Sequence, residues 1–189
     1  MVARASIWFF TEARTNIRCA NLYEQQTDRH SSGIELPSAS FPRYFAELAT
    51  ENVIAADRAQ SDSRTSEFTD SYFAPLGITS SLDIPIRSEG KMVGIMWHEH
   101  IGPSRQWKLE EIQFATSVAN TLSLVLESAD RRKAEIETER SKSFLNSVIE
   151  NLPIMVFVKD AKHLRFVRWN KGCGRPDWAD ARVRPREIG

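Results

Sequence analysis

One stretch of the chain alternates apolar and polar residues on both sides of a tight turn, and it constrains the fold more than any other. The stretch "SSLDIPIRSEGKMVGIMWHEH" spans residues 80–100. Its alternating apolar residues are Leu82, Ile84 and Ile86 before Glu89-Gly90, and Val93, Ile95 and Trp97 after it. A period of two places successive side chains on opposite faces of a strand, and a glycine-containing turn between two such runs predicts a β-hairpin. The fold therefore includes an antiparallel sheet.

The segments before this hairpin mix strand and helix patterns. "RASIWFF" (residues 4–10) is rich in aromatic and β-branched residues, which predicts a strand. "NIRCANLYEQQ" (residues 16–26) alternates, with Ile17, Cys19, Asn21 and Tyr23 on one face, and predicts a second strand paired with the first. Further along, the patterns predict a polar loop at residues 27–40 and a helix at 41–52. A short strand at 53–59 and a loop that runs into another helix at 60–77 follow.

From Leu109 the apolar spacing is that of a single helix as far as about Glu150. The second half of this helix is almost entirely charged, yet an apolar residue still recurs every seven positions. Such a rhythm predicts the seam of a parallel homodimer, formed by Leu122, Val125, Ala129 and Ile136. The alternative is a single solvated linker helix. A helix this polar gains little stability alone, which favours the dimer.

Composition excludes several classes of protein. The 189 residues suit one domain and a fragment of another, with 41% hydrophobic and 26% charged residues. Lys plus Arg equals Asp plus Glu at 25 each, which gives no charge-based argument for nucleic-acid binding. Apolar runs near the start are too short for a signal peptide or a membrane span. Cys19 and Cys173 are far apart and form no CxxC motif, so reduced thiols in a cytoplasmic protein are expected.

The order and spacing of several segments resemble a GAF domain, especially those of bacterial hybrid sensor histidine kinases. The longest is "LGITSSLDIPIRSEGKMVGIMWHEHIGPSRQWKLEEIQFATSVANTLSLVLE", and "HSSGIELP", "FPRYFAEL" and "SDSRTSEF" are similar to earlier pieces of the family. The resemblance covers Ala3 to Glu127. It implies an α+β fold in which helices flank an antiparallel sheet, with a long signalling helix at the C-terminal end. The family places a helix before the first strand, and that helix is expected to be missing here.

The segment "FLNSVIENLPIMVFVKDAKHLRFVRWNKG" resembles the opening of a PAS domain. The expected organisation is therefore a GAF domain at 1–128, a signalling helix or coiled-coil linker at 129–150, and a truncated PAS start at 151–172. Residues 173–189, "CGRPDWADARVRPREIG", show no periodicity and are expected to be an aberrant or disordered tail. A one-base shift of the reading frame can encode "AAEDLTGLTR", which resembles the usual PAS continuation; ordinary terminal disorder is the alternative.

"HEHIGPSR", from His98 to Arg105, allows three interpretations. A zinc site needs three or four ligands, and no third ligand is indicated. A kinase phospho-acceptor histidine lies on a helix, whereas this motif ends a strand. In phytochrome-like GAF domains a similar stretch lies beside the bound tetrapyrrole, and this resemblance implies a ligand pocket with Tyr72, His98 and His100. Covalent bilin is not expected, because residues 68–77 contain no cysteine. The cofactor is otherwise unspecified, and a packed pocket without ligand is the alternative.

These features predict a non-catalytic sensory fragment of a bacterial multi-domain signalling protein such as a histidine kinase. No nucleotide-binding Gly-rich segment follows the histidines. A signal at the GAF pocket would change the packing or register of the long helix and so bias the next module. The expected partners are a second copy of the chain and an unidentified small molecule, without nucleic acid or membrane. The alternative is a GAF module that binds nothing and only dimerises.

Overall fold

The computed structural model describes residues 2–164 and 166–170. The chain divides into two compact units, Met1–Ala129 and Asp130–Gly189. The predicted tail at 173–189, with Cys173, lies outside the described residues. The part of the chain that is described contains no helix long and apolar enough to cross a membrane.

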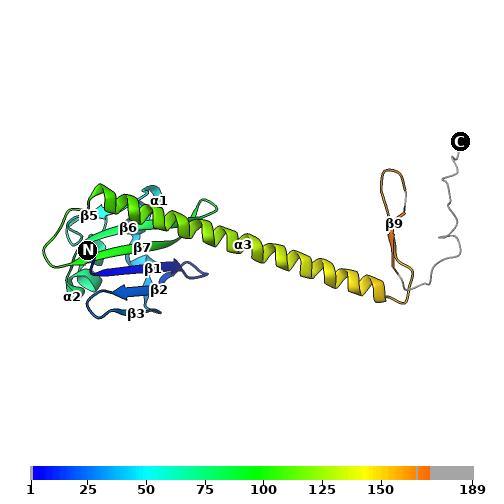
Figure 1. The fold of residues 1–189 in the computed structure, drawn as a ribbon, viewed down its shortest axis with the longest axis horizontal. Helices are drawn as coiled ribbons and strands as arrows, with labels where there is room; N and C mark the ends of the chain where they lie inside the picture. The colour runs from blue at the N-terminus through cyan, green and yellow to red at the C-terminus, as the bar shows by residue number, and fades with distance from the viewer. Residues whose placement is uncertain (1, 165, 171–189) are drawn as a thin grey trace. The chain divides into compact units, whose positions relative to one another are not determined.

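The first unit is built on an antiparallel sheet in the order β3-β2-β1-β7-β6-β5, with β4 also paired to β2 (Figure 1). Its strands are β1 (Arg4–Phe10), β2 (Asn16–Glu24), β3 (Arg29–Ser31), β4 (Glu35–Pro37), β5 (Ile54–Ala56), β6 (Ile78–Ser88) and β7 (Lys91–Ile101). The helical elements are η1 (Ser38–Ser40), α1 (Pro42–Thr50), η2 (Ser66–Phe68), η3 (Thr69–Phe73), α2 (Ala74–Leu76) and α3 (Leu109–Asn151). The predicted α+β class, with helices flanking an antiparallel sheet and a long C-terminal helix, is confirmed.

The predicted central hairpin is β6 and β7. Its turn residues Glu89 and Gly90 both have positive φ, at 50° and 75°. Two successive residues in this region form the tight turn whose twist matches that of paired strands. The strand at 4–10 and the helix from Leu109 also have the predicted bounds to within one or two residues.

Two details of the N-terminal half differ from the sequence patterns. The polar segment 27–40 is not simply a loop, because β3 and β4 both pair with the outer edge of β2. In β2 the predicted alternation holds only as far as Cys19. Ile7 pairs with Asn21 and Trp8 with Cys19, so Ala20 is an extra residue in a β-bulge. The bulge reverses the alternation, and the next buried residue is Leu22 rather than Asn21.

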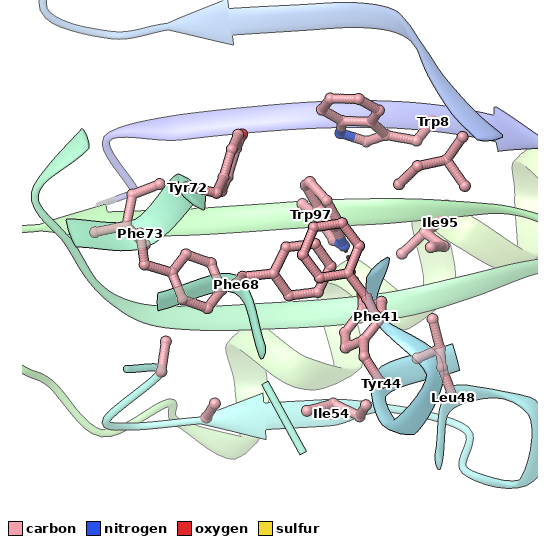
Figure 2. Packing of buried hydrophobic residues seen from close by; sticks show 14 of the residues in the cluster. Trp8, Phe41, Tyr44, Leu48, Ile54, Phe68, Tyr72, Phe73, Ile95 and Trp97 are labelled. Atoms are coloured by element: carbon pink, nitrogen blue, oxygen red, sulfur yellow. Dashed lines mark hydrogen bonds between the residues drawn. The ribbon is translucent and has the colours of Figure 1, made fainter. Parts of the chain in front are cut away.

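Aromatic side chains dominate the core on one face of the sheet (Figure 2). We call this cluster, which includes Trp8, Tyr44, Phe68 and Trp97, the first core. The Phe68 ring lies edge-on to Tyr44 at 4.8 Å and to Trp97 at 5.5 Å between ring centroids. The Trp97 indole N–H donates to the Tyr44 hydroxyl over 2.6 Å. This bond satisfies a buried donor and ties α1 to the centre of the sheet.

Helix α3 covers the opposite face of the sheet with its N-terminal part. Ala115 and Ala119 are buried there against Ile84 and Met96, in what we call the second core. Alanine has no side chain beyond Cβ, which lets the helix backbone approach the strands closely. Trp107, just before the helix, packs in the same core. The sheet thus separates an aromatic core from a helix-covered core.

The second unit contains the C-terminal part of α3 and a hairpin of β8 (Phe157–Lys159) and β9 (Phe166–Trp169). Asn170 is buried within it, and its side-chain amide donates to the carbonyls of Ile149 and Ile154 over 2.8 and 2.9 Å. Its side-chain oxygen accepts from the backbone N–H of Val156 over 2.8 Å. One side chain therefore links the end of the helix to the segment that leads into β8.

Candidate functional site

A row of polar residues crosses four strands on the first-core face of the sheet. The register places Ser81 of β6 opposite Glu99 of β7, Glu99 opposite Arg4 of β1, and Arg4 opposite Glu24 of β2. Residues directly opposite each other in an antiparallel pair point to the same face. Arg4, Ser81 and Glu99 are 5%, 1% and 1% exposed, which is unusual for two charged residues.

Tyr72, on η3, packs on the same face of the sheet as Trp97 (Figure 2). The Arg4 guanidinium carbon is 5.7 Å from the centre of the Tyr72 ring, and the Tyr72 and Trp97 rings are 5.6 Å apart. Tyr72 is 6% exposed. We call Arg4, Tyr72, Ser81 and Glu99 the polar cluster. It lies between the sheet and the helical segment that crosses it.

The hydrogen-bonding capacity of the polar cluster is largely unused. Both carboxylate oxygens of Glu99, Nε and Nη1 of Arg4, and the hydroxyls of Tyr72 and Ser81 are buried without a hydrogen bond of ordinary geometry among the described residues. The Tyr72 hydroxyl still interacts with Glu99, and the Ser81 hydroxyl with Asp83. The Arg4 Nε lies 3.6 Å from Glu99 and 3.5 Å from Glu24, within ion-pair range but too far for hydrogen bonds. A buried group left without a partner costs about 1–3 kcal/mol. The cluster is therefore a group of buried donors and acceptors that satisfy one another only in part.

The environment changes the acid–base properties of these groups. Burial raises the pKa of Glu99 to about 7, although the positive charge of Arg4 opposes the shift. Burial also raises the pKa of the Tyr72 phenol, helped by the negative charge of Glu99, so Tyr72 stays neutral at physiological pH. The thiol of Cys19 is buried nearby, and burial raises its pKa as well. The group in the cluster that titrates near neutral pH is thus Glu99.

We expect the stability of the protein to fall as pH rises through the folded-state pKa of Glu99. The folded state binds this proton more tightly than the unfolded state, whose pKa is close to 4.5. The raised pKa of Glu99 stabilises the folded state by about 3 kcal/mol. This stabilisation is fully present below pH 4.5 and is lost once the pH exceeds about 7. Glu99→Gln should remove it. Urea unfolding of both proteins at pH 5 and pH 8 measures the difference.

The comparison with Glu99→Gln is needed because other groups titrate in the same window. Burial raises the pKa of Asp83, which adds a change of the same sign. Burial lowers the pKa of His98, which makes stability rise with pH instead. The His98 contribution is the same in the variant and cancels in the difference. The Asp83 contribution becomes smaller in the variant, because the negative charge of Glu99 helps to raise the pKa of Asp83, and this adds to the expected difference. A Glu99→Gln protein with the same pH dependence as the wild type would contradict the assigned environment of Glu99.

The structure does not bring together the three residues predicted to line a ligand pocket. Tyr72 lies over the first-core face with Trp97 and Glu99. His98 and His100 alternate with those residues along β7, so they point to the opposite face, where Met96 packs under α3. The Nδ1 atoms of both histidines are buried without a partner among the described residues. The polar cluster therefore contains Tyr72 but neither histidine.

Sequence reasoning missed Arg4, Ser81 and Glu99. A signal for two of them existed. Arg4 is in phase with Ser6 and Trp8, and Glu99 is in phase with Ile95 and Trp97, at the buried positions of their strands. A charged residue at a buried position is informative, because it is costly unless it has a role.

The residues predicted to form a dimer seam on α3 differ from one another in exposure. Val125 and Ile136 are 59% and 47% exposed, and Ala129 is also exposed. Leu122 is half-buried and packs on the second core. Phe114, at 71% exposed, lies on the same side of the helix as Val125. Within the first unit, α3 thus presents both a sheet-facing stripe and an exposed apolar stripe.

Comparisons with known proteins agree on the fold of the first unit. The GAF domain of a two-component sensor histidine kinase from Bacillus halodurans is 20% identical, with a TM-score of 0.54, over 70% of this chain and 86% of that one. The blue-light absorbing form of the PixJ GAF domain from Thermosynechococcus elongatus is 17% identical, with a TM-score of 0.62, over 72% and 81%. The phycocyanobilin-bound GAF domain of a cyanobacterial phytochrome is 16% identical, with a TM-score of 0.58, over 69% and 78%.

At these identities the solved structures show a shared fold and nothing more. No curated protein sequence matches the chain. The model of the GAF domain family, however, matches residues 2–126, which is well over half of the chain. It includes every strand of the large sheet, all four residues of the polar cluster, and the part of α3 that packs on the sheet. The chain therefore belongs to the GAF domain family.

Proposed function

We propose that the chain is a sensory module of a bacterial multi-domain signalling protein, in which a small polar signal acts at the polar cluster and α3 carries the response. The observation that supports this most is the set of buried polar atoms on Arg4, Tyr72, Ser81 and Glu99 that form no hydrogen bond of ordinary geometry among the described residues. Groups that only stabilised the core would be expected to be paired. The fold shared with a sensor histidine kinase GAF domain supports the same class of role.

The route from the cluster to α3 is short. Glu99 lies two residues before the end of β7, and residues 102–108 then lead directly into the helix. The backbone N–H of Trp107 donates to Asp57 over 3.1 Å, and the Trp107 ring packs in the second core with Ala115. A displacement of β7 at Glu99 therefore reaches the N-terminus of α3 through the last two residues of β7 and the connection at residues 102–108. The response is a changed packing or register of the helix.

Hydrogen exchange on the full chain tests this relay without a known ligand. Glu99→Gln keeps the size of the side chain and mimics the protonated carboxyl, so it changes the charge at the cluster. We expect altered amide protection in residues 102–129 at pH 8, where wild-type Glu99 is ionised. Glu35→Gln, on the exposed strand β4, is the matched control and should leave that segment unchanged. Identical exchange in wild type and Glu99→Gln would contradict the relay.

A second candidate is a GAF module that binds no ligand and acts by dimerisation. The exposed apolar stripe of Phe114, Val118 and Val125 favours it, because three large apolar side chains in helical register seldom face solvent without a partner. For both candidates we propose the parallel homodimer of α3 that the seven-residue apolar rhythm predicts. They differ at the polar cluster, where only the sensory role predicts that Glu99→Gln alters α3.

A further inference from the structure

A polar cleft of about 610 Å³ lies between the segment after β5 and the connection that precedes α3. The charged residues that line it are Asp57, Arg58, Asp62, Arg64 and Arg105. Ser61, Ser104 and Gln106 add polar groups at its walls. It shares no residue with the polar cluster.

Two of the three arginines are only partly engaged. Arg64 donates from Nε and Nη2 to Asp62 over 2.9 and 2.6 Å, and from Nη2 to the carbonyl of Ala55. Arg105 donates from Nη2 to the carboxylate of Glu111 and stacks over the Trp107 ring at 4.6 Å. The Nη1 group of each donates to no acceptor in the described part of the chain. The Arg58 guanidinium is exposed and likewise has no partner among the described residues.

Three of the four carboxylate oxygens of Asp57 and Asp62 already accept hydrogen bonds. Both oxygens of Asp62 accept from Arg64. One oxygen of Asp57 accepts from the backbone N–H of Trp107. Since a guanidinium carries five N–H donors and no acceptor, the donors left over in this cleft exceed the acceptors left over. A ligand that supplies several oxygen acceptors in one compact group would match them.

We propose that this cleft binds a small molecule through an oxyanion, a phosphate or carboxylate group, held by Arg58 with Arg64 and Arg105. Planar guanidinium groups match the paired oxygens of both anions and form strong charge-assisted hydrogen bonds with them. The cleft volume accommodates a metabolite larger than the anion itself.

The site is built into the base of α3. The backbone N–H of Arg105 donates to the Ser80 hydroxyl over 2.9 Å, and that hydroxyl donates to the carbonyl of Asp57 over 2.8 Å. Glu111, the partner of Arg105, lies in the first turn of the helix and also accepts from the backbone N–H of Lys108. An anion bound at the unused Nη1 group of Arg105 shares the positive charge that attracts Glu111, and so weakens this N-terminal connection. The cleft is therefore a second site at which a ligand would affect α3, independent of the polar cluster.

Calorimetric titration of the full chain tests the proposal, with inorganic phosphate and pyrophosphate in one arm and succinate and citrate in the other. We expect saturable binding in at least one arm, which identifies the anion. Arg58→Ala should weaken it about tenfold or more, as expected for the loss of a charge-assisted hydrogen bond. Arg29→Ala, an exposed arginine on β3, is the matched control and should bind like the wild type.

The Arg58 side chain has no partner to lose in the part of the chain that the structure describes, so its replacement should leave the fold intact, and circular dichroism checks this. An Arg58→Ala protein that binds as tightly as the wild type would overturn the proposal. So would the absence of saturable binding in both arms up to about 10 mM of each anion. Equal weakening by Arg58→Ala and Arg29→Ala would show a general charge effect and would also overturn it.

Discussion

Replacing Gly94 with alanine is expected to destabilise the first unit more than the same change at any other described glycine. Gly94 lies in the middle of β7, beside β1. A Cβ at this position would lie 2.2 Å from the backbone oxygen of Trp8 and 2.8 Å from the ring of Phe9. The oxygen belongs to the paired strand and cannot move without breaking the β1–β7 ladder. We expect the free energy of unfolding to fall by more than the roughly 0.5–3 kcal/mol that is usual for a single substitution. Urea unfolding measures this change.

Gly90→Ala is the matched control for this prediction. Gly90 has a φ of 75°, but an added Cβ would meet nothing within 4 Å. Its cost is therefore only that of backbone strain, about 1–2 kcal/mol. If Gly94→Ala were no more destabilising than Gly90→Ala, strands β1 and β7 would not approach each other as closely as the structure places them.

The second large effect is expected on α3. Val125→Glu should convert the proposed parallel homodimer to monomer, because two carboxylates would meet in an apolar seam and each would be desolvated there. Ile136→Glu should act in the same way. Sedimentation of the full chain at about 50 µM measures the change. The circular dichroism should be unaltered, since Val125 is 59% exposed and lies outside both cores.

Gln113→Glu serves as the control, because it adds the same charge on an exposed side of α3 away from the seam. It should sediment like the wild type. A wild-type monomer at this concentration, or a Val125→Glu dimer of undiminished affinity, would rule out the seam. Exposed Val125 and Ile136 would then belong to a solvated linker helix.

Much of the fold was predictable because its patterns are local. The hairpin of β6 and β7 follows from strict alternation and from Glu89-Gly90, and α3 follows from its helical spacing. The extra residue at Ala20 was not predictable. Its effect depends on pairing with β1, which is set by the whole sheet rather than by the sequence of β2. The short strands β3 and β4 form for the same reason, on an edge that β2 provides.

The candidate site was predictable only in part. Tyr72 was identified, but the grouping with His98 and His100 ignored the alternation of β7, which the sequence does show. The contact between Arg4 and Glu99 was beyond sequence reasoning, because it needs the register of two strands that are 95 residues apart in the chain. The cleft of Arg58 and Arg105 needs two loops to meet in space.

Strand β7 contributes side chains to both cores, so substitutions on its two faces constrain each other during evolution. Trp97 fills the first core while its neighbour Met96 fills the second. A larger or smaller residue at position 97 moves the strand, and the helix side must adjust at Ala115 or Ala119 to keep its contact. Substitutions on the two faces are therefore not independent. Among related sequences, changes at Trp97 should be accompanied by changes at Met96 and Ala119, so that the residues of the first and second cores covary.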